Sequence, residues 1–380
     1  MSLRPLRRVV CALSGGVDSA VAALLLRRKG YQVTGVFMKN WDLLDEHGAC
    51  TSDQDCEDAY RVCKMLNIPF HQISYVKEYW HEVFSLLWKC WLGGDAMATG
   101  HYARTSQHDE EVFQNKPTGI TEDSYNNHCK DAVKLLQAAD TKKDQTFFLS
   151  QISQHALRHT IFPLGALRKN VVKELAAEAG FHHVLKRKES MGICFIGERN
   201  FENFILEYLE PRPGNFVSIE DGKVMGTHKG WFLFTLGQRA RIGGQRDAWF
   251  VVDKEINTGD VFVAPGTTHP ALYRNSLQID PVHWIAQDAP LELLRDRVMQ
   301  CSFRFQHQMP LVPCQLIFNP DDTVWVTLAN PVRAATPGQF AVLYKDQECL
   351  GSGKIKGLGP SIYTLQQGEG AELARPRRLT

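Results

Sequence analysis

A glycine turn between an apolar run and a helix constrains the fold of this chain more than any other feature. Val9–Leu13 is apolar, and Ser14-Gly-Gly-Val-Asp-Ser19 follows it directly. This order predicts a buried strand, a tight turn, and a helix that begins near Asp18 and runs through Ala20–Arg28. Such a turn directs backbone N–H groups and the positive end of a helix dipole at one point, so the matching ligand is a phosphate chain.

The residues of the turn distinguish it from two other phosphate-binding loops. Gly15 and Gly16 allow a phosphate to approach the backbone closely, and the hydroxyls of Ser14 and Ser19 add donors. A Walker A loop would carry a lysine before its last Ser or Thr, and this turn has none. The Gly-x-Gly-x-x-Gly spacing of dinucleotide-binding turns is also absent. An ordinary strand–turn–helix without a ligand is the remaining alternative.

The first half of the chain alternates predicted strands and helices, which favours a parallel sheet covered by helices on both faces. Ligands of such sheets bind beyond the carboxyl ends of the strands, where the glycine turn, Met38 and Gly100-His101 fall. After the first strand, we predict strands at Tyr31–Met38, Ile68–Tyr75, Ala96–Gly100 and Ala132–Ala138, and helices at Asp55–Leu66, Phe147–Ile152 and 166–180.

The second half has a different texture. Residues 214–268 are rich in Gly, Arg and β-branched or aromatic residues and indicate a small mixed domain. Farther on, turn signals separate short strands, and Gln315–Phe318 and Thr323–Leu328 flank Asn319-Pro-Asp-Asp as a predicted hairpin. We expect a small β-barrel here.

Composition limits the class of protein. The formal net charge is +1, which argues against a polyanion-binding tail but not against a local basic patch. The ten cysteines include no Cys-x-x-Cys pair, which argues against zinc ribbons and cysteine-held iron–sulfur clusters. No apolar run is long enough to span a membrane. The arginines at positions 4, 7 and 8 resemble an organellar presequence only faintly.

Six motifs, in order along the chain, carry a resemblance to a known family. Besides the glycine turn they are Gly35–Trp41, Thr99–Arg104, Lys143–Phe148, Met191–Gly197 and Thr235–Arg239. Together they resemble the tRNA-specific 2-thiouridylases, members of the ATP pyrophosphatase superfamily, and are most similar to the animal mitochondrial branch. The resemblance implies a parallel-sheet ATP-pyrophosphatase domain at 1–205, a small central domain at 206–272, a C-terminal β-barrel at 273–368 and a disordered tail at 369–380.

The resemblance also implies a reaction. The family replaces the C2 oxygen of the wobble uridine in the tRNAs for Lys, Glu and Gln by sulfur. ATP and Mg²⁺ activate that oxygen by adenylation, and a sulfur-donor protein supplies persulfide sulfur to a cysteine that matches Cys194. The basic residues Lys186–Lys188 favour a thiolate there. Taken without the family, the surroundings of Cys194 in the sequence favour a packing cysteine in a buried strand.

Further site residues are implied position by position. Without the resemblance, Met38, at a strand end, and His101 are interpreted as structural residues. The triplet that begins at Lys143 is then interpreted as a helix N-cap, and Arg304 as a solvated strand residue. The implied nucleotide-binding residues are Ala12, Leu13, Ser14, Gly15, Gly16, Val17, Asp18, Ser19, Met38 and Gly100, with Asp18 also catalytic beside Cys194. The implied tRNA-binding residues are His101, Lys143, Asp144, Gln145, Arg304, Phe305 and Gln339.

The chain departs from the family between the third and fourth predicted strands. There the family has a long insert with a Pro-Asn-Pro-Asp run, which meets the target base, and a Cys-Asn pair that supplies a second catalytic thiol. The stretch from Val76 to Gly94 contains neither motif. Its one thiol, Cys90, lies between Trp88 and Trp91 and does not resemble the family's motif.

Three functions therefore stay open. The first is a tRNA-uridine 2-sulfurtransferase of mitochondria. The second is another ATP pyrophosphatase of the amide-forming type, which would not need Cys194. The third is a catalytically impaired variant that still binds ATP or tRNA. The sequence indicates no membrane partner and does not define an oligomeric state.

Overall fold

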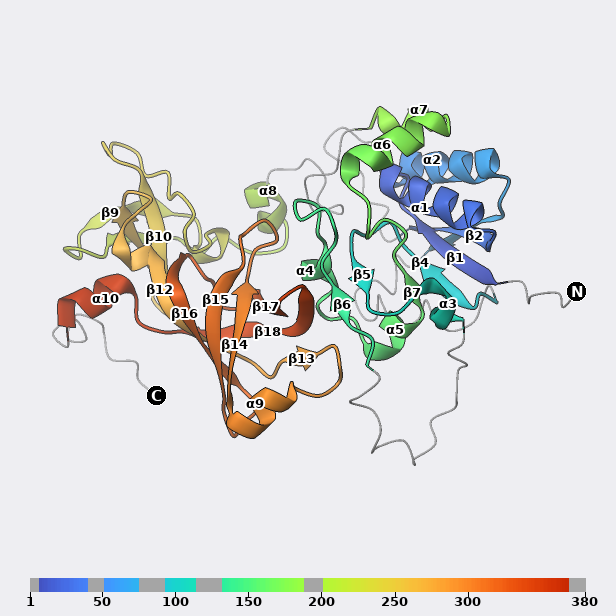
Figure 1. The fold of residues 1–380 in the computed structure, drawn as a ribbon. Coiled ribbons are helices and arrows are strands. Elements are labelled where there is room, and N and C mark those ends of the chain that lie inside the picture. The colour runs from blue at the N-terminus through green and yellow to red at the C-terminus, as the bar shows by residue number, and fades with distance from the viewer. Residues whose placement is uncertain (1–6, 40–50, 75–92, 114–131, 188–200, 369–380) are drawn as a thin grey trace, which may run out of the picture. The chain divides into compact units, whose positions relative to one another are not determined.

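The computed structural model describes residues 7–39, 51–74, 93–113, 132–187 and 201–368 (Figure 1). These residues fall into two compact units. The first runs to Arg199 and also includes Trp284–Asp288 and Gln347–Leu350. The second comprises Asn200–His283, Ala289–Asp346 and the chain from Gly351 onward.

A five-stranded parallel sheet forms the centre of the first unit. Its strand order is β3-β2-β1-β4-β7, so β1 lies in the middle and its carboxyl end opens between β2 and β4. The five strands are β1 (Arg8–Leu13), β2 (Gln32–Lys39), β3 (Phe70–Ser74), β4 (Ala96–Ala98) and β7 (Thr160–Ile161). The parallel sheet predicted from the alternating pattern is confirmed.

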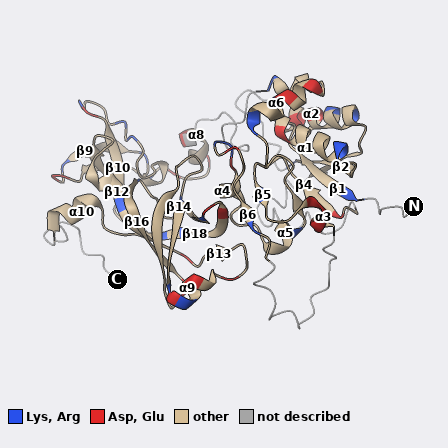
Figure 2. Cartoon of the chain, in the orientation of Figure 1, with Lys and Arg blue, Asp and Glu red and all other residues tan. Residues whose placement is uncertain are grey.

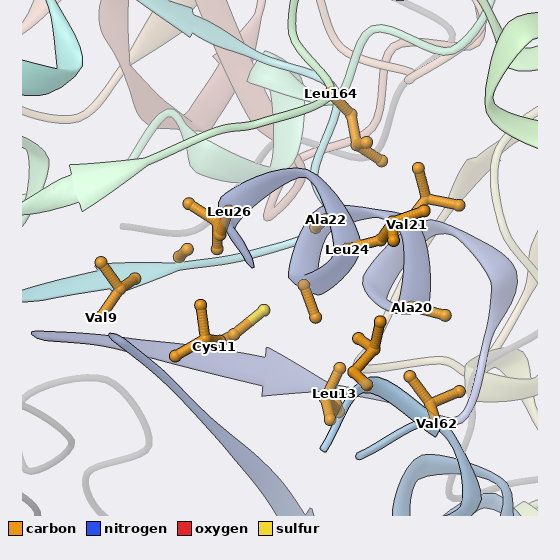
Figure 3. Packing of buried hydrophobic residues seen from close by; sticks show 14 of the residues in the cluster. Val9, Cys11, Leu13, Ala20, Val21, Ala22, Leu24, Leu26, Val62 and Leu164 are labelled. Carbon is orange, nitrogen blue, oxygen red and sulfur yellow. The ribbon is translucent and has the colours of Figure 1, made fainter. Parts of the chain in front are cut away.

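Helix α1 (Val17–Arg28) packs directly on this sheet (Figure 3). Val9, Cys11 and Leu13 alternate along β1 and are buried among the residues of the helix. Seven of the twelve residues of α1 are buried, four of them in the run Ala20–Ala23. Each fully buried Val or Leu contributes about 1.5–3 kcal/mol through the hydrophobic effect. This packing fixes the start of α1 relative to the end of β1.

Further helices surround α1. It contacts α2 (Thr51–Leu66), α6 (Lys169–Glu178) and α7 (His182–Leu185). Residues of both charge signs lie along α1, α2 and α6 (Figure 2). The remaining short helices of this unit are α3 (Asp109–Val112), α4 (Thr146–Leu149) and α5 (Gln154–Arg158). No helix within the described ranges is long and apolar enough to cross a membrane.

One strand, predicted at Ala132–Ala138, was assigned to the wrong sheet. Within 132–138 the structure has β6 (Leu135–Leu136), which pairs antiparallel with β5 (Arg104–Thr105) outside the parallel sheet. The fifth parallel strand is instead β7, beside β4. Apolar alternation at Val133 and Leu135 reports burial of one face, and it does not specify the neighbouring strand.

The second unit begins with a four-stranded sheet in the order β10-β11-β8-β9. Its strands are β8 (Gly214–Ser218), β9 (Val224–His228), β10 (Trp249–Lys254) and β11 (Val261–Pro265). The pairing of β11 with β8 is parallel and the other two are antiparallel, so the sheet is mixed. Helix α8 (Phe201–Leu206) precedes the sheet, and the 3-10 turns η2 (Trp231–Leu233) and η3 (Pro270–Leu272) follow β9 and β11.

A closed β-barrel follows farther along the chain. Strands follow the order β12-β16-β15-β14-β17-β18, and β12 pairs again with β18 to close the ring. They are β12 (Tyr273–Ile279), β14 (Val298–Arg304), β15 (Val312–Phe318), β16 (Val324–Arg333), β17 (Phe340–Lys345) and β18 (Glu348–Leu358), with β13 (His283–Trp284), α9 (Leu291–Asp296) and α10 (Ile362–Gln367). The predicted hairpin is confirmed, because Phe318 pairs with Val324 across the turn.

Candidate nucleotide site

The predicted turn joins β1 to α1 in a conformation suited to an anion. Gly16 is the N-cap of α1 and has no side chain that could accept a bond from the first helical N–H groups. These N–H groups have no intrahelical acceptors and carry the positive end of the helix dipole. Gly15 has φ of +76°, the left-handed region that favours glycine.

Hydroxyl groups hold the turn in shape. Ser19 is buried, and its hydroxyl donates to the Gly16 carbonyl at 3.0 Å while its oxygen accepts from the Ser14 N–H at 3.1 Å. The two serine oxygens lie 3.2 Å apart. The Ser19 hydroxyl therefore shapes the loop, whereas the exposed Ser14 is the hydroxyl that faces solvent.

The three glycines of the site are required for different reasons. A Cβ on Gly15 would lie 2.5 Å from the Asp55 carbonyl oxygen on α2, and a Cβ on Gly100 would lie 2.7 Å from the Ser19 nitrogen. Both glycines therefore permit backbone segments to pack together. A Cβ on Gly16 would have its nearest described neighbour, Ser14 Oγ, at 3.4 Å. Packing leaves room there, so Gly16 is the glycine whose absent side chain leaves space for a ligand.

Asp18, on the first turn of α1, is the centre of a small polar network. Both of its carboxylate oxygens accept from Lys169 Nζ at 2.7 Å, and one accepts from the Tyr102 hydroxyl at 2.9 Å. Lys169 Nζ also lies 5.9 Å from the centre of the Tyr102 ring. The Asp18 side chain is 34% exposed and the Lys169 side chain 12%. A carboxylate and an ammonium group therefore stand at the helix end that faces the loop.

His101 lies next to this network. Its Nδ1 is 2.9 Å from Thr99 Oγ1. Burial lowers the pKa of His101, and the nearby negative charge of Asp18 opposes that shift. A lowered pKa makes His101 neutral at pH 7, so it acts there as a hydrogen-bonding group and not as a cation.

The predicted RNA-contacting triplet lies immediately before α4, and its last residue, Gln145, is the N-cap of that helix. Asp144 is buried, and it accepts from the Ala138 N–H at 3.0 Å and the Thr146 hydroxyl at 2.8 Å. Gln145 accepts from the Tyr102 N–H at 2.9 Å, and its own N–H donates to the Tyr102 carbonyl. Asp144 and Gln145 thus hold neighbouring chain segments in place, and Lys143, the cation of the triplet, is partly exposed.

The barrel residues implied as tRNA contacts are in a different environment. Arg304 is buried and donates to the Tyr344 hydroxyl at 2.8 Å and to the His307 carbonyl at 3.1 Å. Phe305 is 3% exposed. Gln339 is partly buried, and its N–H donates to the Thr336 carbonyl. The structure therefore uses Arg304 and Phe305 in the barrel core.

The remaining predicted residues divide into those near the loop and those that are not described. Ala12 and Leu13 end β1, Val17 begins α1, and Met38 is partly buried near the end of the neighbouring β2. Cys194 and Cys90 lie outside the described residues.

Arg187, predicted to favour a thiolate at Cys194, forms ion pairs with helix α2 in the described part of the chain. Its Nε donates to the Asp58 carboxylate at 2.7 Å, and Nη1 lies 3.2 Å from the Asp55 carboxylate. Burial raises the pKa of Asp55, and the negative charge of Asp58 adds to the rise while Arg187 opposes it. The charge of Arg187 is therefore balanced by α2 and ties the chain before Cys194 to the helix that packs on Gly15.

The sequence analysis missed Lys169 and Tyr102. Lys169 lies 151 residues from Asp18, so no local spacing connects them. One signal was present: Lys169 falls in the first turn of the helix predicted at 166–180, where the helix dipole disfavours a cation that has no anionic partner.

A central parallel strand that passes through a Gly-Gly turn into a helix with an acid on its first turn defines an ATP-pyrophosphatase-like α/β domain. Family models match this chain in order: the tRNA methyl transferase HUP domain at 7–91 and 88–198, the tRNA methyl transferase PRC-barrel domain at 202–265, and the aminomethyltransferase beta-barrel domain at 274–355. The chain belongs to the tRNA-specific 2-thiouridylase family.

Curated relatives agree over nearly their whole lengths. The mitochondrial tRNA-specific 2-thiouridylase 1 of Gallus gallus is 64% identical, over 96% of this chain and 95% of the relative. The Drosophila melanogaster protein of that name is 43% identical, over 93% and 95%. The tRNA-specific 2-thiouridylase of the bacterium Alkaliphilus oremlandii is 38% identical, over 92% and 96%.

The comparisons also bear on the departure from the family. The alignment with the chicken relative runs over 404 positions, more than the 380 residues of this chain, so the relative contains residues with no counterpart here. The HUP-domain model matches in two pieces that meet at residues 88–91. That junction falls inside the stretch where the sequence lacks the expected motifs.

Proposed function

We propose that this chain is a mitochondrial tRNA-uridine 2-sulfurtransferase that uses ATP to form 2-thiouridine at the wobble position. The observation that carries the proposal is the ordered match of all three domains to relatives of that name, with the glycine turn formed at the end of the central strand. The relatives' names give the compartment and the tRNA substrate. The tRNAs for Lys, Glu and Gln are the proposed set.

The loop supplies the activation step. The C2 oxygen of uridine attacks the α-phosphorus of ATP, pyrophosphate leaves, and the oxygen becomes part of a good leaving group, AMP. N–H groups at the start of α1 and the Ser14 hydroxyl bind phosphate oxygens. Met38, at the edge of the loop, packs on adenine, and Gly100 keeps the start of α1 in place.

Mg²⁺ fits this site through one protein carboxylate. Mg²⁺ in nucleotide sites takes one or two carboxylates together with phosphate oxygens. Asp18 is a suitably placed hard ligand, and no group of three or more metal-binding side chains gathers elsewhere within the described residues. When bound, the ion neutralises charge on the phosphates that leave.

Sulfur transfer is assigned to Cys194. A persulfide on Cys194, loaded by a donor protein, attacks C2 through its terminal sulfur and expels AMP. The product is a disulfide between the uridine C2 sulfur and Cys194. A thiol must then attack the Cys194 sulfur to release 2-thiouridine, and it ends as a disulfide with Cys194 that a reductant must reopen.

The same chemistry makes a catalytically impaired variant the second candidate. The family's second thiol lies in the segment that is missing around residues 88–91. Without it, Cys90 and a small external thiol are the candidates for the releasing thiol. The amide-forming class has no comparable support, because its members would need neither Cys194 nor the barrel that this chain contains.

Mass spectrometry of nucleosides tests the proposal. Unmodified mitochondrial tRNA-Lys is incubated with the chain, ATP, Mg²⁺ and a persulfide source, with and without dithiothreitol. We expect 2-thiouridine from the unmodified chain and none from Cys194→Ser. A product only with dithiothreitol assigns the missing thiol as the defect, and a product from Cys194→Ser contradicts the mechanism. ATP binding with no product in either condition favours the impaired variant.

A further inference from the structure

The phosphate loop has no lysine of its own, yet a lysine stands at it. Walker A loops place a lysine within the loop to bind terminal phosphates. Here Ser14–Ser19 has none, and Lys169 Nζ lies 2.7 Å from both carboxylate oxygens of Asp18 on the first turn of α1. The cation is thus delivered to the loop by a different helix.

Lys169 is fixed at both ends of the residue. Its backbone N–H donates to the Asp140 carboxylate at 3.0 Å, which caps the start of α6. Its side chain is 12% exposed and passes the Tyr102 ring to reach Asp18. A surface ion pair needs no such restraint, since exposed pairs contribute little to stability. The arrangement holds a positive charge where phosphates are expected.

If Asp18 holds Mg²⁺ as proposed above, its carboxylate would be shared between the ion and Lys169. An ammonium group has three donors, and a carboxylate that binds Mg²⁺ offers fewer lone pairs to it. Phosphate oxygens that enter with the ion carry the negative charge that Asp18 gives up.

We infer that Lys169 is the phosphate-binding lysine of this site and contacts the pyrophosphate portion of the nucleoside triphosphate. The inference rests on the proposed binding of ATP at the loop. The two possible roles of Lys169 predict different binding. If Lys169 binds phosphate, its removal weakens the binding of ligands that carry the pyrophosphate portion, whereas a purely structural partner of Asp18 has no such selective effect.

Binding measurements with ATP, AMP and inorganic pyrophosphate test the inference on the full chain with Mg²⁺. Loss of a charged hydrogen bond corresponds to about a 10- to 100-fold weaker affinity. Lys169→Met is expected to weaken ATP and pyrophosphate binding by that factor and AMP binding by less than about twofold. Lys169→Arg is expected to recover most of the loss.

Lys173→Met is the matched control, because Lys173 is exposed and lies one turn farther along the same helix. It is expected to bind all three ligands like the unmodified chain. A similar loss of AMP and ATP binding in Lys169→Met, or no loss of either, overturns the inference. If the unmodified chain binds none of the ligands, the proposed function itself fails.

A double substitution separates direct contact from charge balance. Removing Lys169 leaves the Asp18 carboxylate unpaired, and that charge alone would repel phosphate. In an Asp18→Asn background this repulsion is gone, so a direct contact still predicts weaker pyrophosphate binding when Lys169→Met is added. Equal binding by Asp18→Asn and the double variant would show that Lys169 only neutralises Asp18. This comparison also decides the case if Lys169→Met alone unfolds.

Discussion

The glycine loop and the Arg304-Phe305 pair, at the end of β14 and just after it, are both implied as ligand contacts by the same resemblance, and their surroundings differ. At the loop, helical N–H groups, an exposed serine and an acid stand together at a strand end. In β14, a buried arginine is bonded to Tyr344 and His307, and the next aromatic ring is in the core. A motif that depends on backbone conformation leaves its ligand-binding groups accessible. Side chains in a strand, by contrast, can instead be buried in the core.

Gly15→Ala is expected to give the largest effect, and it tests the backbone side of the comparison. A left-handed conformation costs a non-glycine residue about 1–3 kcal/mol, and contact with the Asp55 carbonyl adds to this. We expect a loss of about 3 kcal/mol in the free energy of unfolding, measured by urea denaturation. Unchanged stability with weakened ATP binding would show that Gly15 serves the ligand instead.

Arg304→Met tests the barrel side. Leaving the buried Tyr344 hydroxyl and His307 carbonyl without their donor is expected to destabilise the protein by about 2 kcal/mol. The measurement is chemical denaturation of the variant, together with tRNA affinity at a temperature where both proteins are folded. Weaker tRNA binding at undiminished stability would contradict a purely structural role and remove the contrast with the loop.

Gly16→Ala is the matched partner of Gly15→Ala. The φ of −94° suits alanine and no described atom crowds its Cβ, so we expect a stability change below about 1 kcal/mol. A methyl group where phosphate approaches is expected to weaken ATP binding about tenfold, by calorimetry. Equal ATP affinity would place the phosphate away from Gly16.

His101→Gln gives the smallest effect, on the pH dependence of stability. The folded-state pKa of His101 lies below the unfolded value of 6.5, so unfolding takes up a proton between the two values. Stability contributed by the neutral ring is present above pH 6.5 and is lost as the pH falls below it, with a slope of at most about 1.4 kcal/mol per pH unit. Denaturation midpoints between pH 5 and 8 should vary less in the variant, and an identical profile would contradict the assignment.

The parts of the fold that could be predicted from the sequence are those marked by a continuous apolar run or a glycine turn. Val9–Leu13 and the turn after it appear as expected, because a buried strand and a glycine turn are local features. The two-residue strand Thr160–Ile161 was missed, because it is too short for any periodicity. Strand Leu135–Leu136 was placed in the wrong sheet, since alternation does not name a partner.

The site follows the same rule. The positions of Gly15, Gly16 and Asp18 could be predicted because all three belong to one local strand–turn–helix unit. Lys169 could not, because its partner comes from a distant helix, and the burial of Arg304 depends on how the whole barrel closes. Packing between distant segments determines the surroundings of such residues, and a single sequence does not show which segments pack together.

The junction at residues 88–91 lies in the connection from β3, at one edge of the sheet, back to β4 beside β1. Register in the sheet is set by the strands themselves, for example by Val9 opposite Ala96. Doubling the length of a flexible connection costs only about 0.6 kcal/mol in chain entropy. A segment lost or inserted in this connection therefore costs the sheet little in chain entropy. The chemistry of the enzyme can change in this way during evolution while the strand pairing stays the same.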